Sequence, residues 1–392
     1  MENNFVKRAG EILPELIAHR RYFHENAELG TNLPKTVAYV TKELVALGYD
    51  PKPCGPCGLV ALAGGKKPGK VIIVRGDMDA LPITEETGLP FASKTPYMHA
   101  CGHDMHTAGL LGVAKLLKEH EDEIEGTVKL MFQPDEEGIA GAKKMIDDGL
   151  FENPKVDAAI GAHVFAQQEG GIMASFIDAA LASSDIFAIN ITGKGGHGAS
   201  PETTIDPINV GVHIHLALQA VISREISGLS PAVLTIGRFS AGAMANVIPA
   251  TAVLEGTIRT FSAEVREKIR TRLVEISSSI AETFGATAEV VWKSGCPPLY
   301  NEPNLVREIN GYLQDLLTPE KAIIVETKHM GSEDFAYVSE IVPTSFIGVY
   351  AKKADWDFTS HHTSMVDFDE SVLVNQAAGL AYAAICWLKN NK

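Results

Sequence analysis

Three short, mainly apolar segments, each followed directly by polar side chains, constrain the fold of this 392-residue chain most. Their length and residue types are those of buried strands. These segments are 71–74, 127–132 and 158–162. The polar residues that follow them are Arg-Gly-Asp-Met-Asp at 75–79, Gln-Pro-Asp-Glu-Glu-Gly at 133–138, and His163. Ligands usually bind beyond the carboxyl ends of the strands in an open α/β sheet. We therefore expect the three polar clusters to converge on one edge of a sheet.

Helical spacing of apolar residues surrounds these strands. It runs from Phe5 to Leu47 with a break at the Gly30–Pro34 turn, and it returns at about 140–148 and from Glu370 to Leu388. Two more strands are expected at 322–326 and 344–349. Helices alternating with strands predict an α/β domain.

The pattern changes between residues 183 and 296. Strands are expected at 185–191, 233–239, 251–260 and 288–292, and helices at 208–221 and 264–284. The resulting strand-helix-strand-strand-helix-strand order is that of a ferredoxin-like α+β unit. We therefore expect an inserted domain over 183–296, which splits the α/β domain into 1–182 and 297–392. A chain of this length also exceeds the usual size of one hydrophobic core.

Composition excludes several classes of protein. With 34 Lys+Arg against 49 Asp+Glu the formal charge is −15, which argues against nucleic acid or an anionic membrane surface as partner. We see neither a signal-peptide pattern nor a stretch of about 20 apolar residues that would span a bilayer. A cytoplasmic location is the expectation by default. Five cysteines in so long a chain fit a reducing compartment, where thiols stay free for metal or chemistry.

The segment from His99 to His106 holds a thiol, three imidazoles and a carboxylate. Borderline divalent ions bind thiolate, imidazole and carboxylate together, so the segment predicts metal ligands, Cys101 and His103 among them. The alternative is a solvated histidine-rich loop with one buried cysteine. His163 and the carboxylates after the second strand favour the metal interpretation.

The adjacent Glu136 and Glu137 also have two interpretations. They could be a negative first turn that complements a helix N-terminus. They could instead divide the work of a catalytic centre, where one carboxylate binds the metal and the other takes a proton from water and passes it to the leaving amine. Near the C-terminus the pair His361-His362 offers a further imidazole.

Six motifs occur in an order that resembles the M20 metallopeptidases. They are Arg75-Gly-Asp-Met-Asp-Ala-Leu-Pro82, Ala100-Cys-Gly-His-Asp-Met-His106, Gln133-Pro-Asp-Glu-Glu-Gly138, Gly195-Gly-His-Gly-Ala-Ser-Pro201, Asn246-Val-Ile-Pro249 and Met330-Gly-Ser-Glu-Asp-Phe335. The resemblance is greatest to the hippurate hydrolases, auxin-conjugate amidohydrolases and N-acetyldiaminopimelate deacetylases, whose metal motif contains a cysteine. It covers about residues 19–370. It implies a metal-dependent exopeptidase-like catalytic domain that carries a dimerisation or lid domain.

The resemblance also implies a ligand set for two divalent ions. The matching residues are Cys101, His103, Glu137, His163 and His362, and Glu136 matches the general base. His362 is preferred to His361 by counting back from Asp367-Phe-Asp-Glu370. This chain has Ser364 where the family usually has a proline, so the choice between the two histidines stays open. Zinc, manganese, cobalt and nickel are all compatible with these ligands.

Three other residues, His197, Asn246 and Asp79, receive roles by the same resemblance, and Arg259 receives one by its chemistry. His197 would polarise the scissile carbonyl, in this subunit or in the partner of a homodimer, and Asn246 would contact the substrate. The alternative for His197 is a hydrogen bond within its own loop. Arg259 suits a substrate carboxylate through its bidentate geometry, the alternative being an ion pair with a glutamate. Asp79 would orient a metal-bound imidazole, the alternative being a loop cap.

The predicted activity is hydrolysis of the amide bond of an N-acyl amino acid by metal-activated water with Glu136 as base. The nearest rival is a dipeptidase or carboxypeptidase on the same scaffold. A binding protein that has lost catalysis is a rival from another class, but every ligand position and both glutamates are present. Cys54 and Cys57 have the spacing of a redox dithiol, yet they precede a strand rather than open a helix, so we interpret them as a turn.

Overall fold

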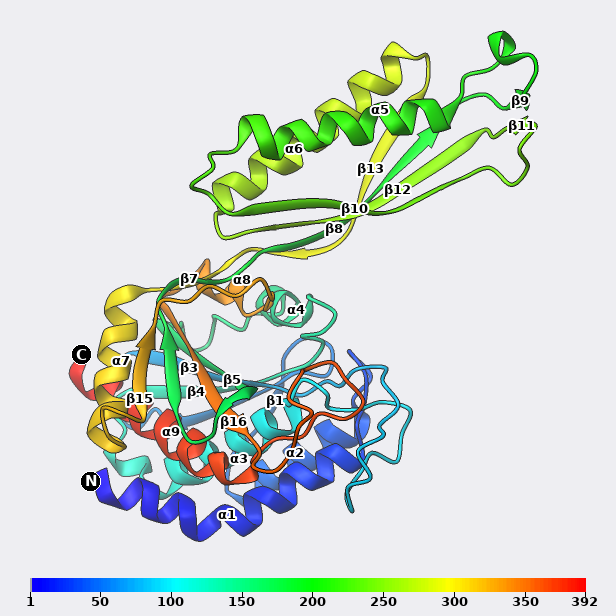
Figure 1. The fold of residues 1–392 in the computed structure, drawn as a ribbon. Coiled ribbons are helices and arrows are strands. Elements are labelled where there is room, and N and C mark those ends of the chain that lie inside the picture. Colours follow the sequence, from blue (N-terminus) through cyan, green and yellow to red (C-terminus); the bar gives the residue numbers. More distant parts are fainter. Residues whose placement is uncertain (1) are drawn as a thin grey trace. The chain divides into compact units, whose positions relative to one another are not determined.

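The computed structural model describes residues 2–392, and side chains from residue 4 onward. The chain divides into two compact units (Figure 1). The first comprises the chain up to Asp178, Tyr300–Thr327 and Asp334–Lys392. The second comprises Ala179–Leu299 and Lys328–Glu333. The second unit therefore extends beyond the insert expected over 183–296 at both ends, and it also includes the short segment 328–333.

An eight-stranded sheet forms the centre of the first unit. Its strand order is β1-β2-β4-β3-β5-β16-β6-β15. The strands are β1 (Lys52–Pro53), β2 (Leu59–Gly64), β3 (Val71–Asp77), β4 (Thr127–Gln133), β5 (Ala158–Glu169), β6 (Met173–Phe176), β15 (Ala322–Val325) and β16 (Thr344–Lys352). Strand β3 lies between β4 and β5 and is parallel to both. The predicted α/β class is confirmed.

The register of these strands brings their polar residues to one edge. Asp77 at the end of β3 pairs with Gln133 at the end of β4. The expectation that the third strand ends at His163 was wrong, because β5 continues to Glu169 by pairing with β16, where His163 lies opposite Gly348. His163 nevertheless lies near the ends of β3 and β4, since β3 pairs with β5 only as far as Gly161.

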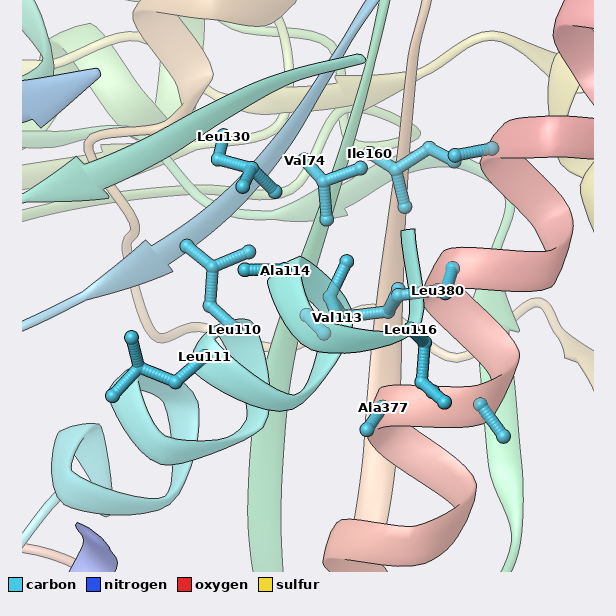
Figure 2. Close-up of a cluster of buried hydrophobic side chains, with 14 of the residues drawn as sticks. Val74, Leu110, Leu111, Val113, Ala114, Leu116, Leu130, Ile160, Ala377 and Leu380 are labelled. Atoms are coloured by element: carbon cyan, nitrogen blue, oxygen red, sulfur yellow. The ribbon is translucent and has the colours of Figure 1, made fainter. Parts of the chain in front are cut away.

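Helices cover the sheet. They are α1 (Glu2–Glu25), α2 (Pro34–Ala46), α3 (His103–Glu119), α4 (Gly141–Asp147), α7 (Pro303–Leu316), α8 (Ala336–Ser339) and α9 (Leu373–Asn390), with short 3-10 turns at Glu121–Glu123 and Glu370–Val372. Helix α9 packs against α1, α3 and α7. Figure 2 shows Val74, Leu130 and Ile160 of the sheet facing α3, with Ala377 and Leu380 of α9 beside it. Helix α3 is thus buried on both sides, which holds the residues at its N-terminus in place.

One segment has the length and hydropathy of a membrane span. Residues 370–390 have a mean hydropathy of 1.4 over an 18-residue window, whereas no membrane-spanning stretch is expected from the sequence. In the structure 78% of that window is buried inside the protein, as in the core helix of a soluble domain. Its apolar residues therefore belong to the core of the first unit.

The second unit is a four-stranded antiparallel sheet covered by two helices on one face (Figure 1). Its strands are β8 (Ser184–Thr192), β10 (Ala232–Ala241), β12 (Thr251–Thr260) and β13 (Thr287–Cys296), and its helices are α5 (Pro207–Ala220) and α6 (Ala263–Thr283). The sheet order β10-β12-β8-β13 is that of a ferredoxin-like unit. It has a hydrophobic core of its own, formed by residues such as Phe187, Ile214 and Leu273.

Several small elements complete the chain. They are β7 (Asp178–Leu181), β9 (Gly196–His197), β11 (Val247–Ile248), β14 (Leu299–Asn301), a 3-10 turn at Pro201–Thr203 and a π-helical turn at Val221–Glu225. Strand β9 pairs with β11, which places His197 opposite Val247.

Candidate metal centre

Side chains from four separate segments of the first unit meet beyond the ends of β3 and β4. The Sγ atom of Cys101 lies 3.3 Å from Nε2 of His163 and 3.4 Å from Nε2 of His362. The same His362 nitrogen lies 3.5 Å from Oε1 of Glu137. His103, the first residue of α3, has its Nε2 3.9 Å from Oε1 of Glu137. The structure thus brings together the five residues that we predict as ligands from the sequence.

These donor atoms fit divalent cations. Among the groups of three side chains whose ligand atoms all lie within 4.8 Å of one another, two contain Cys101: one adds His103 and His163, the other Glu137 and His362. Among the described side chains, both ring nitrogens of His103 and Oε1 of Glu137 are buried without a hydrogen-bond partner. Buried polar atoms are normally hydrogen-bonded, so their convergence here indicates a place for metal ions.

The pKa shifts of the donor groups also favour a site for metal ions. Burial raises the pKa of the Cys101 thiol well above its usual value, and burial also raises the pKa of Glu137 to about 7. Anionic thiolate and carboxylate are costly at such positions unless a positive charge compensates them. The side chain of His362 is 53% exposed, so the centre is open to solvent on that side.

Gly102 makes the turn that directs both Cys101 and His103 into the site. Its φ of +90° lies in the left-handed region, which favours glycine. A Cβ atom at this position would lie 2.4 Å from Cγ2 of Val164, too close for a real contact. The glycine therefore allows a ligand before the helix and a ligand at its first residue to face one site.

Asp79 connects the glutamate pair to a ligand. Its carboxylate accepts the backbone N–H groups of Glu136 at 3.0 Å and Glu137 at 3.2 Å. Its Oδ1 also lies 3.4 Å from Nδ1 of His103. The contact with His103 fits the predicted role of Asp79 in orienting an imidazole. The two hydrogen bonds to the backbone fit the loop-capping alternative, so Asp79 makes both kinds of contact. Glu136 is buried, with its Oε2 3.9 Å from Nε2 of His103.

A second carboxylate lies on the other side of His103. Asp77 is fully buried and has Oδ2 3.5 Å from Nε2 of His103 and 2.9 Å from a guanidinium nitrogen of Arg75. Its Oδ1 accepts a hydrogen bond from Nδ1 of His106. Burial alone raises the pKa of Asp77, but Arg75 and the two histidines outweigh it and hold the pKa well below its usual range. Asp77 is therefore an anion behind the ligands.

A buried ion network, which the sequence did not reveal, supports the start of α3. The fully buried guanidinium of Arg20 lies 2.9 Å from Asp104, 2.6 Å from Asp367 and 3.1 Å from Glu370. His24 bridges Asp104 at 2.8 Å and Glu85 at 3.1 Å. The network joins α1 to the turn that carries His103. The only trace in the sequence is the density of polar residues around Asp104, because Arg20 and His24 lie about 80 residues away.

The structure also distinguishes the two C-terminal histidines. Nε2 of His361 accepts the backbone N–H of Ala166 at 3.1 Å, whereas Nε2 of His362 faces Cys101 and Glu137. His362 has a φ of +59° and its own N–H donates to Ala100 at 3.0 Å. A non-glycine residue in this region carries backbone strain, which is common at functional sites. This geometry favours His362 as the ligand.

Ser364 stands where the family usually has proline. Its hydroxyl makes a hydrogen bond that a proline side chain could not make. Its hydroxyl donates to a carboxylate oxygen of Glu86, and its carbonyl accepts the Glu86 N–H at 2.9 Å. The serine therefore ties the loop that carries His362 to residue 86 through its side chain as well as its backbone.

The remaining predicted residues lie in the second unit. His197 and Asn246 are exposed and adjacent, since the N–H of Gly198 donates to the Asn246 carbonyl at 2.9 Å. Arg259 donates to Oγ of Ser332 at 2.8 Å and, within the described residues, forms none of the ion pairs with glutamate that the alternative required. Their roles toward a substrate stay predictions.

Cys54 and Cys57 do not lie at the start of a helix. Sγ of Cys54 donates to the carbonyl of Met145 at 3.5 Å, and Sγ of Cys57 donates to that of Thr31 at 2.8 Å. Both thiols are free. Burial raises the pKa of Cys54 to about 11, the opposite of a reactive thiol. The two side chains serve as contacts of a turn that leads into β2.

Comparison with known proteins identifies the family. Residues 73–385 match the model of peptidase family M20/M25/M40. The chain belongs to this family. The resemblance read from the motifs is thereby confirmed, and with it an enzyme that hydrolyses amide bonds.

Relatives of this M20 chain cover nearly its full length. The N-acetyl-L-cysteine deacetylase of Bacillus subtilis (strain 168) is 38% identical over 96% of this chain and 89% of its own length. Thermostable carboxypeptidase 2 of Saccharolobus solfataricus is 37% identical over 97% of both chains. Among solved structures, the Bacillus subtilis YXEP protein, described as a dinuclear metal binding peptidase from the M20 family, has a TM-score of 0.82 at 32% identity, covering 97% of this chain and 99% of its own. The M20 chain is therefore a metal-dependent enzyme.

Proposed function

We propose that this M20 enzyme removes the acyl group from N-acyl amino acids, using two divalent ions held by Cys101, His103, Glu137, His163 and His362. The observation that carries the proposal is the pair of donor groups that share Cys101, with the carboxylate of Glu136 beside them. The deacetylase relative acts on a substrate of this class by its name. A bound metal would supply polarisation of the substrate carbonyl and of the attacking water.

Glu136 is the proposed general base. Its carboxylate accepts a proton from the water that attacks the amide carbonyl, and returns that proton to the nitrogen of the leaving amine. The hydrogen bond from its backbone N–H to Asp79 fixes where the side chain starts. Glu137 is held by the same carboxylate, so one residue sets the positions of the base and of its neighbour.

His197 is the proposed donor to the carbonyl oxygen. Its Nδ1 accepts the N–H of Ala199 at 3.0 Å, so a neutral ring carries its proton on Nε2. The ring is exposed, which leaves this N–H available to a substrate oxygen in its own subunit or in a partner. Asn246, next to it, and Arg259 are proposed contacts for the amide and carboxylate of the substrate.

A homodimer formed through the second unit is part of the proposal. Ile208, Val212 and Leu216 recur every four residues on α5 and expose 39%, 44% and 62% of their surfaces. Strand β10 is at the edge of its sheet and exposes Val233 and Phe239. Apolar surface of this kind marks interaction sites. Light scattering of the purified protein tests it, and a monomer at micromolar concentration would contradict it.

The deciding experiment is Glu136→Gln in protein purified without chelators. We expect the variant to keep the metal content of the wild type while kcat falls at least about 100-fold, since a positioned base contributes that much or more. Elemental analysis of the same samples identifies the metal among zinc, manganese, cobalt and nickel. Substantial residual turnover would refute the role of Glu136, and absence of metal from wild-type protein would refute the centre.

A carboxypeptidase is the second candidate, favoured by the 37% identity to thermostable carboxypeptidase 2. N-acetyl amino acids, N-benzoyl amino acids and free dipeptides assayed side by side separate the two. A higher kcat/KM for dipeptides would reject deacylation as the main activity. We keep the cytoplasm as the proposed location, because the odd number of free thiols suits a reducing compartment.

A further inference from the structure

The C-terminal part of β5 has an unusual set of hydrogen bonds. Strand β3 pairs with β5 only as far as Gly161, so beyond that point this edge of β5 has lost its neighbouring strand. Residues two apart on a strand direct their N–H groups to the same edge. The N–H of Val164 donates to Nε2 of His106 at 2.8 Å, and that of Ala166 donates to Nε2 of His361 at 3.1 Å. Two imidazoles therefore accept the hydrogen bonds that a neighbouring strand would otherwise accept at this edge of β5.

This arrangement decides where the proton of His361 lies. A backbone N–H is always a donor, so Nε2 of His361 must be the unprotonated nitrogen and Nδ1 must carry the hydrogen. Nδ1 lies 3.8 Å from Sγ of Cys101, within reach of a hydrogen bond to sulfur. The other nitrogen is already occupied by the backbone. His361 therefore presents Cys101 with an N–H group and has no lone pair to offer a metal.

His163 has the opposite arrangement. Its Nδ1 lies 2.6 Å from the carbonyl oxygen of Val164, which can only accept, so the proton is on Nδ1. Its Nε2 therefore presents a lone pair at 3.3 Å from Sγ of Cys101. Two histidines that contact the same sulfur thus differ in chemistry, because one presents a lone pair and the other a proton.

We propose that His361 is a positioning residue, whose Nδ1–H donates to the Cys101 sulfur and holds it where both donor groups can share it. The role rests on the proposed ligand set. A thiolate in a buried site gains from a hydrogen-bond donor as well as from cations, and residues that orient a ligand in this way set its geometry and basicity. Phe165 and Phe368 hold the ring, with centroids 6.0 Å and 5.4 Å from that of His361.

Two substitutions separate the bonds of His361. His361→Gln places an amide near the ring Nε2, where its oxygen still accepts the Ala166 N–H but no donor reaches Cys101. His361→Asn places an amide near the ring Nδ1, where its N–H still donates to Cys101. His213→Gln in the second unit is the matched control. Each protein is loaded with cobalt(II), whose thiolate charge-transfer band in the near ultraviolet reports on the sulfur and whose visible bands report on the number of ligands.

The wild type and the His361→Asn and His213→Gln variants are expected to bind two cobalt ions with the same charge-transfer band. In His361→Gln the stoichiometry should persist, while the band moves to lower energy because the sulfur lone pairs lose a hydrogen bond, and cobalt affinity should fall about 10-fold. An unchanged band and affinity in His361→Gln would overturn the proposal. Loss of a cobalt ion in both His361 variants would overturn it by making His361 a ligand. Wild-type protein that binds no cobalt would refute the ligand set and this role with it.

Discussion

Replacing Asp79 by asparagine tests how much one carboxylate contributes to the metal centre. In the structure its two oxygens accept two backbone N–H groups, from Glu136 and Glu137, and Oδ1 also lies 3.4 Å from Nδ1 of His103. An amide has one acceptor oxygen, so in either orientation its NH₂ group meets a donor. A buried N–H left without its partner costs about 1–3 kcal/mol. We expect the metal-free Asp79→Asn protein to lose that much unfolding free energy.

The metal-loaded protein should lose more. Partners that orient a ligating histidine typically contribute 10–100-fold to metal affinity. At saturating metal this weakening removes a further stabilisation of about 1.4–2.8 kcal/mol, because ligand stabilisation follows RT ln(1 + [L]/Kd). Unfolding by guanidinium chloride with and without zinc separates the two losses, and Asp122→Asn, whose side chain is 94% exposed, is the matched control. Equal stability of Asp79→Asn and wild type in both conditions would refute this account of Asp79.

Three further predictions follow from single features. Burial lowers the pKa of His24, but its hydrogen bonds to Asp104 and Glu85 outweigh this and raise the pKa to about 9. Because a raised pKa stabilises the fold below the unfolded value of 6.5 and that stability is lost as pH rises through 9, the unfolding free energy of wild type should fall by up to about 3 kcal/mol between pH 6.5 and 9 relative to His24→Gln. A parallel pH profile for the variant would contradict this. Gly102→Ala should abolish metal binding, measured by dialysis and elemental analysis, because its Cβ would strike Val164; wild-type metal content would show that the turn adapts. Serine at both Cys54 and Cys57 should leave kcat/KM unchanged under reducing and oxidising conditions, and a redox-dependent loss confined to the wild type would restore the dithiol interpretation.

Much of the site could be predicted because its chemistry is local in sequence. Cys101 and His103 occur within one eight-residue segment, and Glu136 and Glu137 directly follow a strand. The end of β5 could not be predicted in the same way. Val164, Phe165 and Ala166 continue the apolar run beyond His163, but residues 167–169, Gln-Gln-Glu, lack a strand-like pattern of their own. They belong to β5 because it pairs with β16, some 185 residues later in the sequence.

Other features of the site could not be predicted for the same reason, because they depend on contacts between residues that are distant in sequence. In the sequence, Arg20 and His24 are polar residues within a helical pattern. Their side chains are buried because they pair with Asp104 and Asp367, which are distant in sequence. Helix α7 is a different case, because its buried residues Leu305, Ile309 and Leu313 recur at helical spacing and are visible in the sequence. His361 differs from His362 because its Nε2 accepts the backbone N–H of Ala166. Such a hydrogen bond to the backbone cannot be predicted from the pattern of side chains.

The packing of α9 against α1 and α3 has a consequence for synthesis of the protein on the ribosome. Helix α1 ends at Glu25 and α9 begins at Leu373, so at 5–20 residues per second roughly 20–70 s separate the appearance of the two helices. During that interval the apolar faces of α1 and α3 lack their final partner. The second unit has its own core within an almost continuous segment, so it can fold first. The catalytic unit is therefore the one expected to depend on chaperones, and its metal centre can form only when translation is nearly complete.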